Sequence, residues 1–132
     1  MRIVLAILMA GHGIAHLPGF LVNWQLRSFP EMPYRTTIVG ASLDVGDAGI
    51  KVIGALWLAV GVGFIVLAGA TLTRAVWWPP IAYVSIVLST VLCLVGWPDA
   101  RLGLVANAVI LLLIVTGVRG PSASSRSYIR SA

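Results

Sequence analysis

The chain has 132 residues, of which 59% are hydrophobic and only 10% are charged, and its mean hydropathy is +1.00. Soluble domains carry about 25% charged residues, so this composition excludes an ordinary water-soluble domain. The formal net charge of +5 does not indicate a nucleic-acid partner, because the basic residues are spread along the chain and lie mostly at the ends of apolar segments.

Four apolar segments predict an all-α, four-helix transmembrane bundle with a long loop between its first two helices. The segments are residues 3–22, 50–72, 77–97 and 102–118. Each is close to the ~20 residues that a helix needs to cross a hydrocarbon core. In lipid, backbone polar groups must be paired within the segment, which favours helices. We expect one transmembrane domain over residues 1–120.

The first segment carries two histidines, His12 and His16. They are four residues apart and therefore lie on one face of a helix. Pro18 removes the N–H that would pair with the carbonyl of Ile14, which predicts a kink near His16. The segment starts like a signal peptide, but the apolar run continues past both histidines, so we expect an uncleaved first helix.

Residues 23–49 form the expected outer loop, which contains Pro30 and Pro33. A loop of this length in so small a protein is usually functional or mobile. Within it, residues 37–43 are apolar enough to dip into the membrane interface or to form a short surface helix.

Polar groups from all four helices fall in the outer half of the predicted bundle. They are His16, Lys51, Ser89, Cys93 and Asn107. Ionisable groups at membrane depth are functional candidates. We therefore predict a polar, ligand-binding pocket that opens outward and is lined by His12, His16, Lys51 and Asn107.

Each of these residues also has a structural interpretation. Lys51 follows Asp47 by four residues, the favourable order for an ion pair. Asn107 and the histidines can form hydrogen bonds between helices. A metal site made of His12, His16 and Asp47 is the alternative, because H-x-x-x-H is the spacing of two zinc ligands on a helix. The zinc-protease glutamate is missing, since Gly13 takes its place, and the sequence identifies no cofactor.

Charges at the segment ends predict the orientation. One side of a four-span bundle holds five basic residues and no acidic one, and the other holds four basic and four acidic residues. By the positive-inside rule, both termini are expected in the cytoplasm. Residues 121–132 are rich in serine and arginine and predict a disordered cytoplasmic tail.

Three segments resemble the DoxX-like family of small four-helix bacterial membrane proteins. Residues 2–17 resemble its first helix, with His12, Gly13 and Leu17 matching and His16 standing where the family often has lysine. Residues 47–74 and 101–122 are similar to its second and last helices. The resemblance implies a location in the bacterial inner membrane and a link to membrane redox assemblies, which include a quinone-reducing oxidoreductase.

The leading functional hypothesis is a DoxX-like integral membrane protein that binds a small ligand, a lipid or a quinone, or serves as an accessory subunit of a membrane assembly. An alternative is a membrane-embedded enzyme in which His12 and His16 act as acid–base groups or metal ligands. A second alternative is a structural protein that associates with another membrane protein or with itself.

Overall fold

The structure, a computed structural model, describes residues 1–118. The predicted disordered tail at residues 121–132 lies outside the described residues. The elements are the helices α1 (Arg2–Ala15) and α2 (Leu17–Asn23), the strands β1 (Thr37–Ile38) and β2 (Leu43–Asp44), and the helices α3 (Gly46–Thr73), α4 (Trp78–Val95) and α5 (Arg101–Val118).

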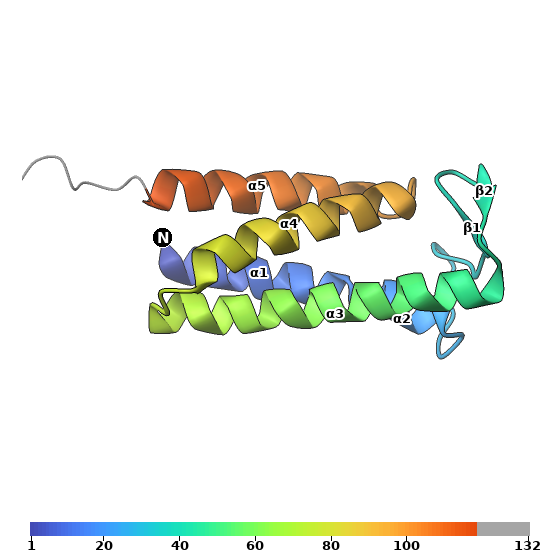
Figure 1. Cartoon of the computed structure of the whole chain (residues 1–132), viewed down its shortest axis with the longest axis horizontal. Coiled ribbons are helices and arrows are strands. Elements are labelled where there is room, and N and C mark those ends of the chain that lie inside the picture. Colours follow the sequence, from blue (N-terminus) through green and yellow to red (C-terminus); the bar gives the residue numbers. More distant parts are fainter. Residues whose placement is uncertain (119–132) are drawn as a thin grey trace, which may run out of the picture.

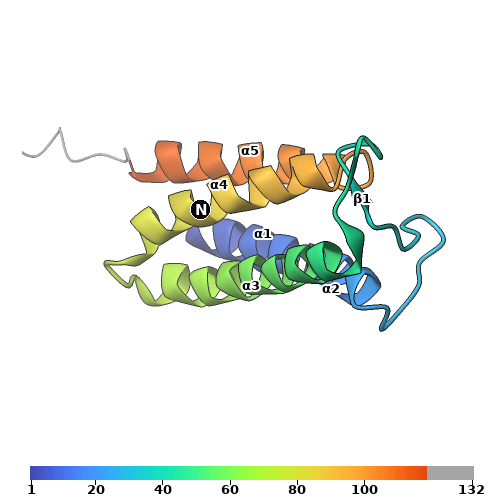
Figure 2. The same ribbon diagram turned by 45° about the vertical axis from the view of Figure 1, so that its right-hand side comes forward.

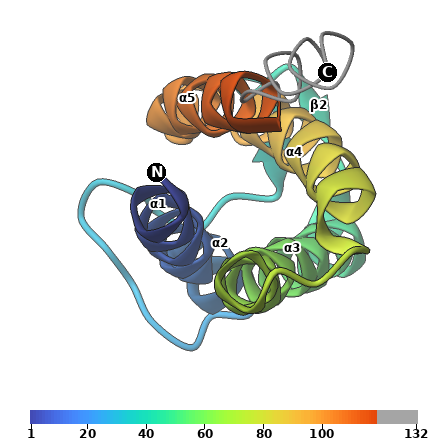
Figure 3. The ribbon, with the colours of Figure 1, turned by 90° about the vertical axis from the view of Figure 1, so that its left-hand side faces the viewer.

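The helices run side by side along the long axis of the molecule (Figure 1). The β1–β2 hairpin lies at one end, and the start of α1 and the α3–α4 turn lie at the other, as the turned view also shows (Figure 2). Viewed from the end, α3 lies between α1 and α4, and α5 lies beside α4 (Figure 3). Because α1 also contacts α5, the four-helix bundle closes. The predicted helical bundle is confirmed.

Three helices are long and apolar enough to cross a membrane, namely α1 together with α2 (Arg2–Asn23), α3 and α4. The fourth, α5, is apolar over Arg101–Gly117 and is shorter. Large apolar side chains point away from the bundle, such as Ile3, Val87 and Val105, which are 67%, 62% and 61% exposed. Water solvates extended apolar surface poorly, whereas lipid tails solvate it well. The structure therefore agrees with the prediction of a membrane protein.

The first apolar segment is interrupted, although residues 3–22 predicted one helix. The backbone N–H of His16 donates to the carbonyl of Gly13 at 3.2 Å, a three-residue spacing that ends the α-helical pattern. Pro18 follows as the second residue of α2, where its missing N–H costs least. The kink expected near His16 is thus present as a break between α1 and α2.

The segment between α2 and α3 is partly β, so of the two expectations for residues 37–43 the short surface helix is wrong. Thr37 pairs with Asp44 and Ile38 with Leu43 in an antiparallel hairpin. Gly40 has a φ of +63° at the hairpin turn, which glycine adopts without strain. The N–H of Gly40 donates to the carbonyl of Trp97 at 3.0 Å. The hairpin is therefore docked beyond the end of α4.

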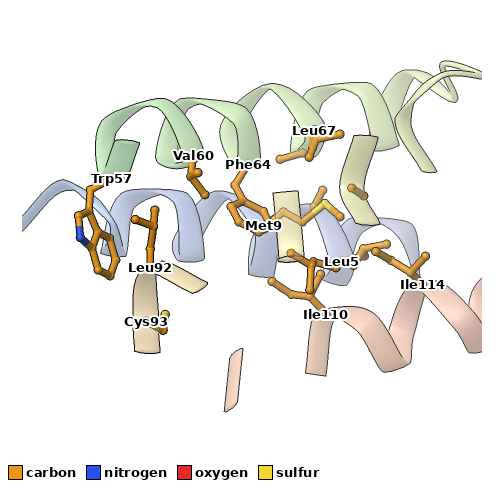
Figure 4. Packing of buried hydrophobic residues seen from close by; sticks show 14 residues of the cluster. Leu5, Met9, Trp57, Val60, Phe64, Leu67, Leu92, Cys93, Ile110 and Ile114 are labelled. Atoms are coloured by element: carbon orange, nitrogen blue, oxygen red, sulfur yellow. The ribbon is translucent and has the colours of Figure 1, made fainter. Parts of the chain in front are cut away.

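A continuous apolar core fills the bundle between its two ends. Figure 4 shows it running from Trp57 at one end, past Phe64 and Met9, to Leu5 and Ile114 at the other. Phe64 and Met9 are fully buried. Side chains from all the long helices meet along this line, so the core holds the bundle in one arrangement.

Two glycines bring α1 and α3 into backbone contact. A methyl group at Gly13 would lie 2.6 Å from the carbonyl oxygen of Gly61, and one at Gly61 would lie 2.8 Å from that of Gly13. Real Cβ atoms do not approach so closely, so both positions require glycine at this separation. Small residues commonly permit such close helix packing in membranes. This contact sets the position of the two histidines against α3.

Candidate functional site

Four polar side chains meet inside the bundle, and we call them the polar cluster. His12 comes from α1, His16 from the α1–α2 break, Ser89 from α4 and Asn107 from α5. All four are buried, with exposed fractions of 6%, 1%, 0% and 3%. The structure thus brings together three of the four residues that the sequence predicted as a pocket lining, and it adds Ser89.

His16 is fixed by the backbone of the preceding turn. Its Nδ1 lies 2.8 Å from the carbonyl oxygen of His12. A carbonyl oxygen only accepts, so Nδ1 carries the hydrogen and, in a neutral ring, Nε2 is an acceptor. The helix break makes this bond possible, because the backbone N–H of His16 bonds to Gly13 instead of His12.

The amide of Asn107 is oriented by Thr90. Its Nδ2 lies 3.0 Å from Ser89 Oγ and 3.2 Å from Thr90 Oγ1. The hydroxyl of Thr90 already donates its hydrogen to the carbonyl of Ile86 at 2.8 Å. Thr90 Oγ1 can therefore only accept from Asn107, which places the NH₂ group toward Ser89 and Thr90 and uses both of its hydrogens.

Ser89 joins the other members of the polar cluster. Its Oγ lies 3.1 Å from Nε2 of His12 and 3.1 Å from Nε2 of His16. A hydroxyl donates one hydrogen bond and accepts two. Ser89 accepts from Asn107 and donates to the bare Nε2 of His16, so it must accept from an N–H at His12 Nε2. With both rings neutral, the two histidines are opposite tautomers.

One acceptor of the polar cluster is left without a donor. Asn107 Oδ1 is buried and has no hydrogen-bond partner among residues 1–118. Nδ1 of His12 is a second acceptor, because the ring proton is on Nε2. An unsatisfied buried acceptor costs about 1–3 kcal/mol. The polar cluster therefore presents acceptors, with its donors already used, and suits a group that donates a hydrogen bond.

Aromatic side chains hold the imidazole rings in place. The ring centroids of His12 and His16 are 4.6 Å apart in an edge-on arrangement. His12 is 4.8 Å from the ring of Phe64, and His16 is 5.0 Å from that of Trp57. These contacts restrict rotation of both rings, so the hydrogen-bond pattern described above has a fixed geometry.

A small pocket of about 70 Å³ lies under the hairpin, and we call it the hairpin pocket. Trp57 forms part of its wall and also packs against His16, so this indole separates the hairpin pocket from the polar cluster. A methyl group at Gly19 would lie 2.7 Å from the indole, and one at Gly96 would lie 3.2 Å from it. The two glycines therefore make the slot in which Trp57 sits.

Polar contacts tie the segment between α2 and α3 to the helix ends. Arg35 forms a salt bridge with Asp99 at 3.3 Å, and both line the hairpin pocket. The hydroxyl of Tyr34 donates to the carboxylate of Asp47, and this hydrogen bond is the main cause that raises the pKa of Tyr34. These contacts hold the segment between α2 and α3 against the end of the bundle.

Lys51 is not part of the polar cluster. Its residue is exposed, and it precedes Gly61, which packs against His16, by ten residues or ~15 Å of helix. The predicted pair with Asp47 is also wrong, because among the described residues only Arg35 and Asp99 form a salt bridge. The expectation that Lys51 lies at the depth of the histidines is therefore wrong.

The proposed metal set of His12, His16 and Asp47 does not form. Within residues 1–118, no three histidine, cysteine or acidic residues lie close enough together to hold a metal ion. Asp47 lies in the first turn of α3, near the hairpin, where it accepts from Tyr34. The spacing of the two histidines suits a metal site, but Asp47 lies at the start of α3, away from them.

Ser89 and His16 resemble the nucleophile and base of a hydrolase, but Ser89 is not free to attack. Both lone pairs of its oxygen accept hydrogen bonds, from Asn107 and His12, and the side chain is fully buried. A nucleophile needs an available lone pair facing its substrate. The geometry favours binding over nucleophilic catalysis at this residue.

The central position of Ser89 in the polar cluster, and the contacts of Thr90 and Trp57 with it, were not predicted from the sequence. Ser89 shares a helical stripe with Ser85 and Cys93, which indicated a polar face but not which hydroxyl would meet the histidines. Thr90 gave no signal, because a threonine in an apolar helix normally bonds to its own backbone.

No family model, no curated protein and no solved structure matches the chain.

Proposed function

We propose that this is a DoxX-like integral membrane protein that binds a small lipophilic ligand through a hydroxyl group. Its four helical units would cross the cell membrane, with both ends of the chain in the cytoplasm. The ligand class that fits best is a quinol, the reduced and hydroxyl-bearing form of a quinone, or a lipid with a free hydroxyl.

The unpartnered acceptor of Asn107 carries this proposal. Its Oδ1 is buried beside Ser89 and has no donor among residues 1–118. A ligand hydroxyl would supply that donor and remove the cost of leaving the oxygen unsatisfied. An oxidised quinone offers only carbonyl acceptors and would find no free donor in the polar cluster, since Ser89, Asn107 and His12 Nε2 already donate.

Access from the hairpin pocket requires side chains to move. The hairpin pocket leads to Trp57, which lies against His16. Because Trp57 fits closely between Gly19 and Gly96, a ligand would reach the polar cluster by this route only if the indole left that slot. The hairpin pocket has an apolar lining from Ile50, Ile53 and Val95, but its volume of about 70 Å³ is below the ~300–1,000 Å³ usual for small-molecule sites, so a ligand would have to displace side chains to enter.

The test compares a short-chain ubiquinol with the matching ubiquinone on the purified protein in mild detergent. We expect the quinol to bind at least about tenfold more tightly, because it satisfies a buried acceptor. Asn107→Leu is expected to remove this preference. Lys51→Ala, outside the polar cluster, is the matched control and should bind as the unmodified protein does.

Equal binding of both redox forms, or an unchanged preference in Asn107→Leu, would contradict the proposal. Absence of binding by both forms, together with no hydroxyl-bearing lipid in an extract of the purified protein, would instead favour the structural interaction protein. Melting temperatures of the two variants show whether a loss of binding is a loss of fold.

A further inference from the structure

The end of the bundle opposite the hairpin holds a second pocket, which we call the basic pocket. It offers about 770 Å³ between the start of α1, the α3–α4 turn and the last turns of α5. This is within the ~300–1,000 Å³ usual for small-molecule sites. The polar cluster and the hairpin pocket share none of its lining residues.

Two arginines line the basic pocket without a counter-ion. Arg2 and Arg74 are both exposed, and neither side chain forms a hydrogen bond or salt bridge with another residue in the part of the chain that the structure describes. All four carboxylates of the sequence are elsewhere, in the α2–α3 segment, the first turn of α3 and the α4–α5 turn. These segments lie at the hairpin end of the molecule (Figure 1).

The backbone around Arg2 increases the demand for an anion. Arg2 lies in the first turn of α1, where the helix dipole presents its positive end and a cation is unfavourable. Arg74 is the C-cap of α3, and its side chain adds a second positive charge to the same pocket. A bound anion would offset the positive potential that these two guanidinium groups create together.

The remaining walls are apolar and indicate what kind of anion fits. Trp78 and Leu113, which are half-buried, line the basic pocket together with the arginines, above the buried Leu5 and Ile114. Beside it, Val76 is 93% exposed and Trp77 is 50% exposed, as expected for residues at a membrane interface. A ligand with a phosphate and an acyl chain matches this combination of surfaces, whereas a free phosphate would leave the apolar walls uncovered.

We propose that the basic pocket binds an anionic phospholipid, with its phosphate on Arg2 and Arg74 and an acyl chain along Trp78 and Leu113. Arginine is suited to this role because its planar group bonds phosphate oxygens in pairs. Basic pockets between transmembrane helices bind lipid head groups in the same way. The inference depends on the membrane location of the helices and is independent of the ligand proposed for the polar cluster.

Native mass spectrometry of the full chain tests this inference. Protein in detergent is titrated with phosphatidylglycerol or phosphatidylcholine, and the bound fraction is measured for the unmodified chain and for the double variant Arg2→Gln, Arg74→Gln. We expect a preference for phosphatidylglycerol that falls by roughly tenfold per arginine removed. The control is Arg27→Gln, Arg101→Gln, which removes two exposed arginines at the hairpin end and should keep the preference.

Three results would overturn the inference. One is equal retention of the two lipids by the unmodified protein. Another is an equal loss of phosphatidylglycerol in both double variants, which would indicate a general charge effect. The third is displacement of the lipid by inorganic phosphate at the same concentration, which would indicate a site for free phosphate. Because both variants change exposed side chains, an unchanged melting temperature is expected for each.

Discussion

Replacing Ser89 by alanine is expected to lower the free energy of unfolding by about 2 kcal/mol. Ser89 Oγ forms hydrogen bonds with His12, His16 and Asn107. Hydrogen bonds between membrane helices average about 0.6 kcal/mol each, and all three are lost together. The measurement is unfolding in mixed micelles as the fraction of denaturing detergent is raised.

Ser85→Ala is the matched control for this variant. Ser85 lies one turn earlier on α4, is also buried, and has no side-chain hydrogen bond among the described residues. Its loss is expected to change the free energy of unfolding by less than about 0.5 kcal/mol. Equal effects of the two substitutions would show that the polar cluster does not hold the helices together.

Replacing Gly13 by alanine is expected to destabilise the bundle by about 2 kcal/mol, within the range for overpacking. The added methyl group would lie 2.6 Å from the carbonyl oxygen of Gly61, which belongs to the backbone and cannot rotate away. α1 must then move away from α3, and this movement shifts both histidines from their partners. The melting temperature should fall, and the ubiquinol should bind more weakly.

Gly11→Ala provides the comparison on the same helix. Nothing lies within 4 Å of a methyl group at this position. Alanine is the better helix former by up to about 1 kcal/mol, so this variant should be as stable as the unmodified protein or slightly more stable. A destabilised Gly11→Ala together with an unaffected Gly13→Ala would contradict the packing of α1 on α3.

Much of the helical architecture is predictable from hydropathy, because lipid requires continuous apolar helices. The expected segment at residues 50–72 corresponds to α3, which begins four residues earlier at Gly46. The expected segment at residues 77–97 corresponds to α4, which begins at Trp78, before Pro79. The hairpin escaped prediction, because its two-residue strands gain stability from docking on α4 and not from a pattern of their own.

Three of the four candidate site residues were predictable from their depth in the expected helices. His12, His16 and Asn107 were expected at similar depth, and the structure brings them together. Lys51 was expected at the same depth, but it is exposed and lies ~15 Å along α3 from Gly61, which packs against His16. Hydropathy is nearly uniform around helices buried in lipid, so it carries little information on helix rotation. Close contacts such as that of Gly13 with Gly61 determine the rotation instead.

The hydrogen-bond pattern around Ser89 is tested by the protonation of the two histidines, measured by nitrogen NMR on protein with labelled histidine. The chain has only these two histidines, so the spectrum contains the signals of two imidazole rings and no others. The hydrogen bonds of the polar cluster predict two neutral rings of opposite tautomers, with the hydrogen on Nδ1 of His16 and on Nε2 of His12. Identical tautomers or charged rings would contradict this pattern, because Ser89 could then not accept from Asn107 and His12 while donating to His16.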